Sequence, residues 1–90
     1  MGDDTKYRRN PDVSWRTIEG QAVLIFNREG EVQVLNEIGT FVWEHSEDPP
    51  ETIARNIADE YEVTFDEALS DTRRFIEELL ASGALVQNEG

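Results

Sequence analysis

The sequence predicts an α+β fold, in which a three-stranded antiparallel meander is followed by three helices. Between residues 13 and 35 lie three short segments with strand patterns, either alternating or continuously apolar, whereas from residue 37 to residue 82 apolar residues recur at the 3.6-residue spacing of helices. Strands that precede all the helices and are joined by short turns pair as neighbours, and the helices then cover one face of their sheet.

The first two strands are expected at residues 13–18 and 21–26. Glu19-Gly20 between them has the length and composition of a two-residue hairpin loop. In the first strand alternate residues, among them Trp15, share one face, whereas the second strand, QAVLIF, is apolar on both faces. We therefore expect the second strand to lie in the middle, with the first and third strands at the edges.

The third strand, residues 31–35, runs into a helix without a linker. Val32 and Val34 alternate with polar residues, which is the period-two pattern of a half-buried strand. At Asn36 the spacing changes to that of a helix, and this asparagine suits an N-cap because its side-chain oxygen can accept a hydrogen bond from an unpaired backbone N–H. Gly30, before the strand, supplies the positive φ angle of a turn.

Three helices are expected: the first at residues 37–46, the second at residues 51–61, and the third from a cap at Thr64 or Asp66 to about Ser82, where Gly83 stops it. Gly39 lies inside the first helix and costs up to ~1 kcal/mol relative to alanine, which indicates close packing at this position. The candidates for the N-cap of the third helix are Thr64 and Asp66. Its apolar stripe consists of Phe65, Ala68, Leu69, Thr72, Phe75, Ile76, Leu79 and Leu80.

One domain is expected, from residue 11 to residue 87, because 90 residues suffice for one modest core. Residues 1–10 are polar and show no periodicity, so we expect them to be flexible. Residues 84–86 form a short apolar tail that can pair or pack, and the four residues that follow are expected to fray.

The net charge of −12 is distributed unevenly. Residues 1–35 carry six acidic and five basic residues, whereas residues 36–90 carry 14 acidic residues against three arginines. Binding to nucleic acid depends largely on lysine and arginine side chains that neutralise phosphates, so the acidic helical half argues against DNA and RNA, and against anionic membranes. Because no stretch has the roughly 18–20 apolar residues of a membrane span and no signal peptide opens the chain, we expect a cytoplasmic protein.

Residues suited to catalysis or metal binding are few. The chain has no cysteine and one histidine, His45, which we expect to lie at a helix C-terminus and to interact favourably with the helix dipole. The six glycines are scattered over turns and ends and form no phosphate-binding loop. We therefore expect no enzymatic activity, no metal site and no cofactor.

Two adjacent arginines lie among acidic residues in the third helix. Arg73 stands four residues before Glu77, and Arg74 four residues before Glu78, the spacing of helical ion pairs that contribute about 0.2–0.5 kcal/mol each. The alternative is that a guanidinium is presented to an acidic partner.

Three segments carry a family resemblance: NPDVSWRTIEGQAVLIFN, GEVQVLNEIGTFVWE and DTRRFIEELLASGAL. With them, the chain from Asn10 to Val86 resembles the PqqD family, small proteins of pyrroloquinoline-quinone biosynthesis, whose fold also serves as the recognition element in pathways that modify ribosomally made peptides. The chain departs from the family's pattern at Pro49-Pro50, where relatives often have an acidic residue and a glycine. It departs again at Thr72, where relatives usually carry an aliphatic residue.

The resemblance implies a winged-helix-like scaffold that captures a peptide. The leader segment of a precursor peptide would add as a strand to the edge of the third strand, in a groove walled by the third helix. Backbone groups would then supply affinity while alternate side chains enter pockets. The absence of a linker before the first helix would hold that edge rigid and so lower the ordering cost of binding.

The resemblance also implies which residues bind the peptide. The strand positions are Glu31, Val32, Gln33, Val34 and Leu35. The helix positions, which share one face, are Asp71, Arg74, Phe75 and Glu78. Among these, Arg74 is expected to pair with an acidic leader residue, and Phe75 is expected either to form the floor of an apolar pocket or to belong to the core.

Three functions compete. The one we favour is a peptide-binding chaperone that delivers the leader to a modifying enzyme, in many such systems a radical SAM protein. The second is an acidic interaction or regulatory domain with a basic partner, whose binding would depend strongly on salt. The third, a winged-helix DNA-binding protein, is disfavoured because the third helix lacks a face rich in lysine and arginine. A homodimer through the third strand, or a swapped strand pair, stays an alternative because a free edge can pair with its own copy.

Overall fold

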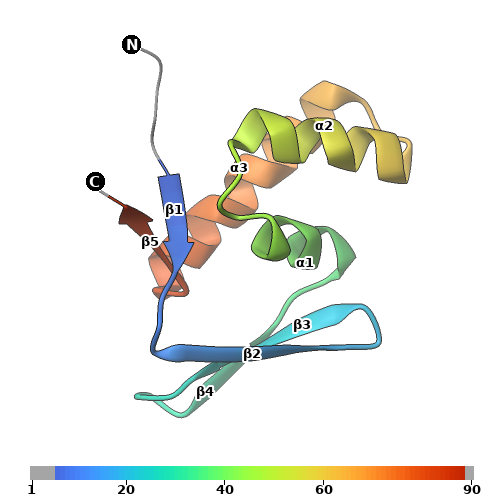
Figure 1. Cartoon of the computed structure of the whole chain (residues 1–90). Coiled ribbons are helices and arrows are strands. Elements are labelled where there is room, and N and C mark those ends of the chain that lie inside the picture. The colour runs from blue at the N-terminus through green and yellow to red at the C-terminus, as the bar shows by residue number, and fades with distance from the viewer. Residues whose placement is uncertain (1–5, 89–90) are drawn as a thin grey trace.

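A computed structural model describes residues 6–88 and confirms the α+β fold. Strands β2, β3 and β4 form the expected antiparallel meander, and β1 and β5 form a separate two-stranded sheet. All three helices lie on one side of the three-stranded sheet (Figure 1). The elements are β1 (Lys6–Arg9), β2 (Val13–Ile18), β3 (Gln21–Phe26), β4 (Glu31–Val34), α1 (Glu37–Glu44), α2 (Pro50–Tyr61), α3 (Phe65–Ser82) and β5 (Leu85–Asn88).

The turns of the meander have the conformations that the sequence predicts. Glu19 and Gly20 take φ angles of 52° and 82°, the pair of left-handed residues typical of a two-residue hairpin loop. Gly30 in the second turn has a φ angle of 70°. The β3 strand lies between β2 and β4, as expected of the segment that is apolar on both faces.

The orientation of β4 differs from what its alternation suggests. Val32 and Val34 point away from the helices and are 61% and 58% exposed. The pairing register causes this, because Gln33 lies opposite the buried Leu24 and residues directly opposite one another share a face. The apolar residue that reaches the core is Leu35, just beyond the strand.

The second half of the N-terminal segment contains a strand that the sequence did not predict. Lys6–Arg9 form β1 and pair antiparallel with β5, a strand that includes Leu85 and Val86 of the predicted apolar tail. Asn10 closes the junction, because its side-chain amide donates to the Gly83 carbonyl at 2.9 Å. Backbone pairing of this kind requires no apolar pattern, which is why the sequence gives no sign of it. The rest of the segments predicted to be loose, residues 1–5 and 89–90, lies outside the described residues.

Helices α1 and α3 begin or end at residues that the sequence singles out. The Asn36 side chain accepts from the Gly39 N–H at 2.8 Å and caps α1, which ends two residues earlier than predicted, with His45 as its C-cap. Of the two candidates for the N-cap of α3, Thr64 takes the role, in a reciprocal capping box with Glu67. Gly83, with a φ angle of 86°, ends the helix.

The core consists of two adjoining clusters, both contacted by Tyr7 and Leu80. The first cluster lies between the sheet and the end of α3 and contains Val13, Ala22, Leu24, Phe26, Leu35, Trp43, Leu79, Ala84 and Leu85. The second joins the three helices and contains Val42, Ile53, Ala54, Ile57, Ala68, Phe75 and Ile76.

Thr72, at one of the family departures, is fully buried, and its hydroxyl has no hydrogen-bond partner in the described part of the chain. None of the described helices is long and apolar enough to cross a membrane.

Candidate functional site

The β4 strand is an edge of the three-stranded sheet. Within residues 6–88 it pairs only with β3, so that the backbone N–H and C=O groups along its other side have no strand partner. Such an edge is a ready template for a further strand, because a bound segment can satisfy these groups. We call residues 31–35 the β4 edge.

The β4 edge is fixed at its C-terminal end by a buried threonine. The Thr40 hydroxyl on α1 accepts from the Ala22 N–H at 2.8 Å and donates to the Leu35 carbonyl at 3.4 Å. Leu35 in turn donates its N–H to the Ala22 carbonyl at 2.9 Å and buries its side chain in the core. Because only Asn36 separates the edge from α1, which begins at Glu37, these hydrogen bonds join the end of the strand directly to the helix.

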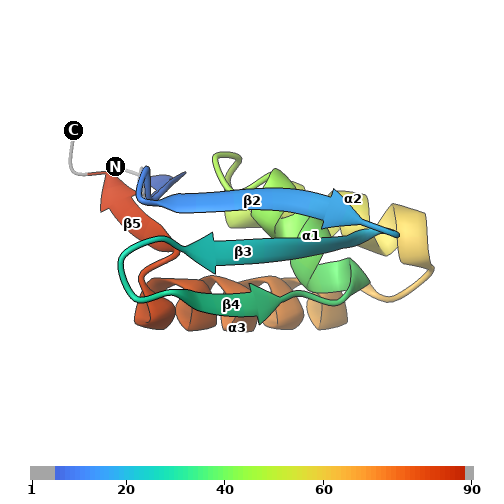
Figure 2. The same ribbon diagram turned by 90° about the horizontal axis from the view of Figure 1, so that it is seen from below.

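The helix α3 lies along the β4 side of the sheet, away from β2 (Figure 2). We call its predicted binding residues, Asp71, Arg74, Phe75 and Glu78, the α3 flank, and they share one face of the helix. The ring of Phe75 contacts the backbone of α1 at Gly39, one turn after the β4 edge. The Arg74 guanidinium lies 5.3 Å from the centre of that ring and 3.2 Å from Asp71 Oδ1, with Glu78 exposed one turn further on.

The structure answers the open question about Phe75. Only 9% of its surface is exposed and it belongs to the second core cluster, so it is a core residue whose outer edge is covered by Arg74. Asp71 is half-buried, whereas Arg74 and Glu78 are exposed. The surface of the α3 flank is therefore formed by charged side chains, and the ring of Phe75 lies beneath them.

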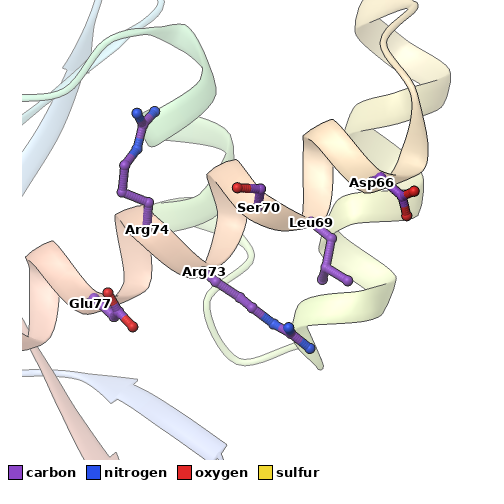
Figure 3. Close-up of a pocket in the computed structure, with 6 residues that line it drawn as sticks. All are labelled: Asp66, Leu69, Ser70, Arg73, Arg74 and Glu77. Carbon is purple, nitrogen blue, oxygen red and sulfur yellow. The ribbon is translucent and has the colours of Figure 1, made fainter.

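The predicted helical ion pairs of the two arginines are wrong. Arg74 Nη2 lies 3.2 Å from Asp71 Oδ1, and Arg73 Nη2 lies 3.7 Å from Glu51 Oε2 on α2. Arg73 pairs with α2 because tertiary packing brings Glu51 close to its side chain. The spacing of residues along a single helix cannot predict such a contact. The side chains of Arg73 and Arg74 therefore point away from α3 in different directions (Figure 3).

A shallow open depression lies between these arginines (Figure 3). Each guanidinium is already paired with a carboxylate, so the depression holds no uncompensated cation for an anionic ligand. Its lining residues are Asp66, Leu69, Ser70, Arg73, Arg74 and Glu77.

The other titratable side chains of note lie near the end of α1. His45 stacks on Phe41 with 4.4 Å between ring centres, and its Nδ1 lies 3.7 Å from Asp48 Oδ2. Burial raises the pKa of the Tyr61 phenol above its ordinary 10.0, and the nearby negative charges of Glu37, Glu60 and Glu44 raise it further. Residues 6–88 contain no group of three side chains arranged to hold a metal ion.

One contact on the β2 side of the sheet, away from the β4 edge, had no signal in the sequence. The Arg9 guanidinium lies 5.1 Å and 5.4 Å from the ring centres of Trp15 and Trp43, which meet edge to face. It also donates to the backbone carbonyls of Trp43, at 3.1 Å, and of Glu44, at 2.8 Å. Arg9 thus fastens β1 to the C-terminal end of α1, and a pairing across 34 residues follows no local pattern.

The fold and the site define a small α+β domain in which, among the described residues, one edge of the sheet has no strand partner and lies beside a long helix. A family model described as Coenzyme PQQ synthesis protein D (PqqD) matches residues 21–85. The chain therefore belongs to the PqqD family.

Two solved structures are similar to this chain. "Lasso peptide synthetase B1 complexed with the leader peptide" has a TM-score of 0.83 and 24% sequence identity, over 90% of this chain and 98% of that chain. "TbiB1 in Complex with the TbiA(beta) Leader Peptide" has a TM-score of 0.79 and 26% identity, over 87% of this chain and 93% of that chain. A search of curated proteins found no match.

Proposed function

We propose that this protein is a peptide-binding chaperone that captures the leader of a ribosomally made precursor peptide. One observation carries the proposal: within residues 6–88 the outer side of the β4 edge has no strand partner, its end is hydrogen-bonded to Thr40 on α1, and it lies on the same side of the sheet as α3. Membership of the PqqD family supports it. So does the likeness to TbiB1, whose structure contains a leader peptide.

The leader would bind as a fourth strand of the sheet, antiparallel or parallel to β4. Backbone hydrogen bonds to the β4 edge would supply affinity that is independent of sequence. Residues that face α3 would meet the α3 flank, where Arg74 can exchange Asp71 for an acidic side chain of the leader. Because Thr40 and Asn36 already fix the end of the edge, little ordering free energy is lost on binding.

We assign the chemistry to a separate modifying enzyme, in many pathways of this kind a radical SAM protein, to which the captured leader would be delivered. We place this encounter in the cytoplasm, where ribosomes release the precursor. The second candidate function, an acidic interaction domain, is favoured by the 14 acidic residues against three arginines in residues 36–90.

The test is an NMR titration of the isotope-labelled protein with synthetic N-terminal halves of the short open reading frames encoded beside its gene. Leader capture predicts amide shifts concentrated at residues 31–36 and 71–79, with affinity that varies little with salt. Shifts confined to the acidic faces of α1 and α2, with steep salt dependence, would favour the interaction domain instead. A homodimer through β4 would occupy the same edge, so dilution would then increase peptide binding.

A further inference from the structure

The face of the sheet that points away from the helices carries an uncovered apolar patch. In Figure 2 this face is turned to the viewer, with the helices behind it. We call Val23, Ile25, Val32 and Val34 the outer patch. Register joins them in two pairs, Val23 opposite Val34 and Ile25 opposite Val32, so that they form one block across β3 and β4.

Exposure within the outer patch rises toward the β4 edge. Val32 and Val34 are 61% and 58% exposed, Ile25 on the middle strand is 37% exposed, and Val23 is half-buried. Each side chain of a sheet is covered on its flanks by neighbours on the adjacent strands, so the two valines of β4 lack the flank that a fourth strand would supply. The uncovered surface therefore adjoins the edge that the proposed function assigns to the leader.

A second copy of this chain, packed face to face, fits the outer patch less well. Such packing needs apolar residues across the whole sheet. On β2, however, the positions opposite Ile25 and Val23 are Ser14 and Arg16, both exposed and polar. Each copy also carries a net charge of −12, which opposes association of two copies.

We infer that the strand captured on the β4 edge carries β-branched or aromatic residues at two positions separated by one residue, and that these cover Val32 and Val34 on the outer face. The inference rests on the proposed function and adds a sequence requirement to it. Residues directly opposite one another share a face, so the residue between these two positions lies opposite Gln33 and faces α3. The ligand is thus a strand that is apolar on its outward side, whereas its inward side meets the polar side chains of Gln33 and Glu31 and the charged α3 flank.

The experiment selects binders from a displayed library of random peptides about a dozen residues long, long enough to span β4. The full-length protein serves as the target, and selection is repeated on the V32T/V34T variant. Threonine keeps the shape and strand propensity of valine, and both positions are exposed, so the variant should fold as the wild type does. The matched control is I18T, which removes an exposed apolar side chain at the far end of β2.

Wild-type selection should enrich β-branched or aromatic residues at two positions with one residue between them, and selection on V32T/V34T should lose that enrichment. A peptide selected on the wild type should bind V32T/V34T about tenfold more weakly, because two cross-strand apolar pairs are lost, and should bind I18T unchanged. Selected peptides should shift the amides of residues 31–35 in NMR spectra.

Three outcomes would overturn the inference. Peptides that shift residues 31–35 but show no enrichment, and bind V32T/V34T as tightly as the wild type, would leave leader capture standing and remove the outward requirement. If no selected peptide shifts the amides of residues 31–35, the β4 edge does not capture a strand, and both this inference and the proposed function fail. If the wild type sediments as a dimer that V32T/V34T converts to a monomer, a second copy covers the outer patch instead.

Discussion

The ring of Phe75 on α3 occupies the space that a side chain at position 39 on α1 would need. A Cβ atom at Gly39 would lie 2.8 Å from Cε1 and 3.1 Å from Cδ1 of Phe75. Both distances are shorter than a normal van der Waals contact, so the two helices approach this closely because residue 39 is glycine. The contact ties the α3 flank to the helix that follows directly from the β4 edge.

Gly39→Ala should therefore destabilise the protein, although alanine favours helices more than glycine by about 1 kcal/mol. Overpacking against the buried ring should lower the free energy of unfolding by about 1–3 kcal/mol, measured by urea denaturation. Phe75→Leu removes the clashing ring atoms, so the double variant should lose less than the sum of the two single variants. A Gly39→Ala variant as stable as the wild type would show that α1 and α3 can separate without cost.

Thr40→Val tests the hydrogen bonds that fix the β4 edge. Valine has nearly the same shape but leaves the Ala22 N–H and the Leu35 carbonyl without the threonine hydroxyl. A buried donor without a partner costs about 1–3 kcal/mol, and we expect the free energy of unfolding to fall by that amount. Thr40→Ser is the control, because it keeps the hydroxyl and removes only a methyl group. Hydrogen exchange at the Ala22 amide should become faster in Thr40→Val and stay slow in Thr40→Ser.

The fold was predictable from the sequence because its signals are local. The turn at Glu19-Gly20, the cap at Asn36 and the stop at Gly83 each act within a few residues, and the structure has all three where expected. The close packing predicted at Gly39 is confirmed for the same reason, since a helical glycine has a local cost that something must offset.

The errors arise where pairing over long distances decides the outcome. The outward direction of Val32 and Val34 depends on the register with β3, and a shift of one residue would have reversed it. The strand at Lys6–Arg9 depends on a partner almost 80 residues away. With the observed register, Val32 and Val34 lie on the face of the sheet that points away from the α3 flank. The role of the predicted site residues in peptide binding stays a prediction.

Arg9→Met should lower the free energy of unfolding by about 1–2 kcal/mol, because it removes the contacts with two indole rings and the hydrogen bonds to the end of α1. Methionine keeps much of the apolar part of the arginine side chain, so the loss of stability measures the contribution of the guanidinium group. Arg9→Lys should recover less than half, since an ammonium lacks the planar fork that reaches both carbonyls. Arg8→Met, on the exposed side of the same strand, is the control and should change stability little.

Tyr61 should titrate above its ordinary pKa of 10.0, because burial and the surrounding glutamates disfavour the phenolate. A phenol whose folded pKa is raised stabilises the fold fully below its unfolded pKa, and this contribution is lost as the pH rises through the folded pKa. Ultraviolet absorbance of phenolate, compared between the wild type and Tyr61→Phe, isolates this residue from Tyr7. Glu37→Gln should move the Tyr61 titration back toward 10.0. An unchanged titration would mean that the carboxylate is too far away to act.

Arg74→Glu is the variant that bears most directly on the α3 flank. The side chain is exposed and its ion pair with Asp71 is a surface pair, so its loss should change the free energy of unfolding by less than about 1 kcal/mol. If Arg74 pairs with an acidic residue of the leader, reversing its charge should weaken binding of a peptide identified by the NMR titration at least tenfold.

Arg73→Glu is the matched control, because it makes the same change of charge on the neighbouring residue, which is equally exposed and points toward Glu51 on α2. It should leave peptide affinity within about threefold of the wild type at physiological salt, where charges more than a Debye length from the peptide are largely screened. Equal losses for the two variants would mean that the peptide responds to net charge alone and that the α3 flank is not a specific contact. A loss of stability in Arg74→Glu, without a change in affinity per folded molecule, would mean that Arg74 serves to cover Phe75.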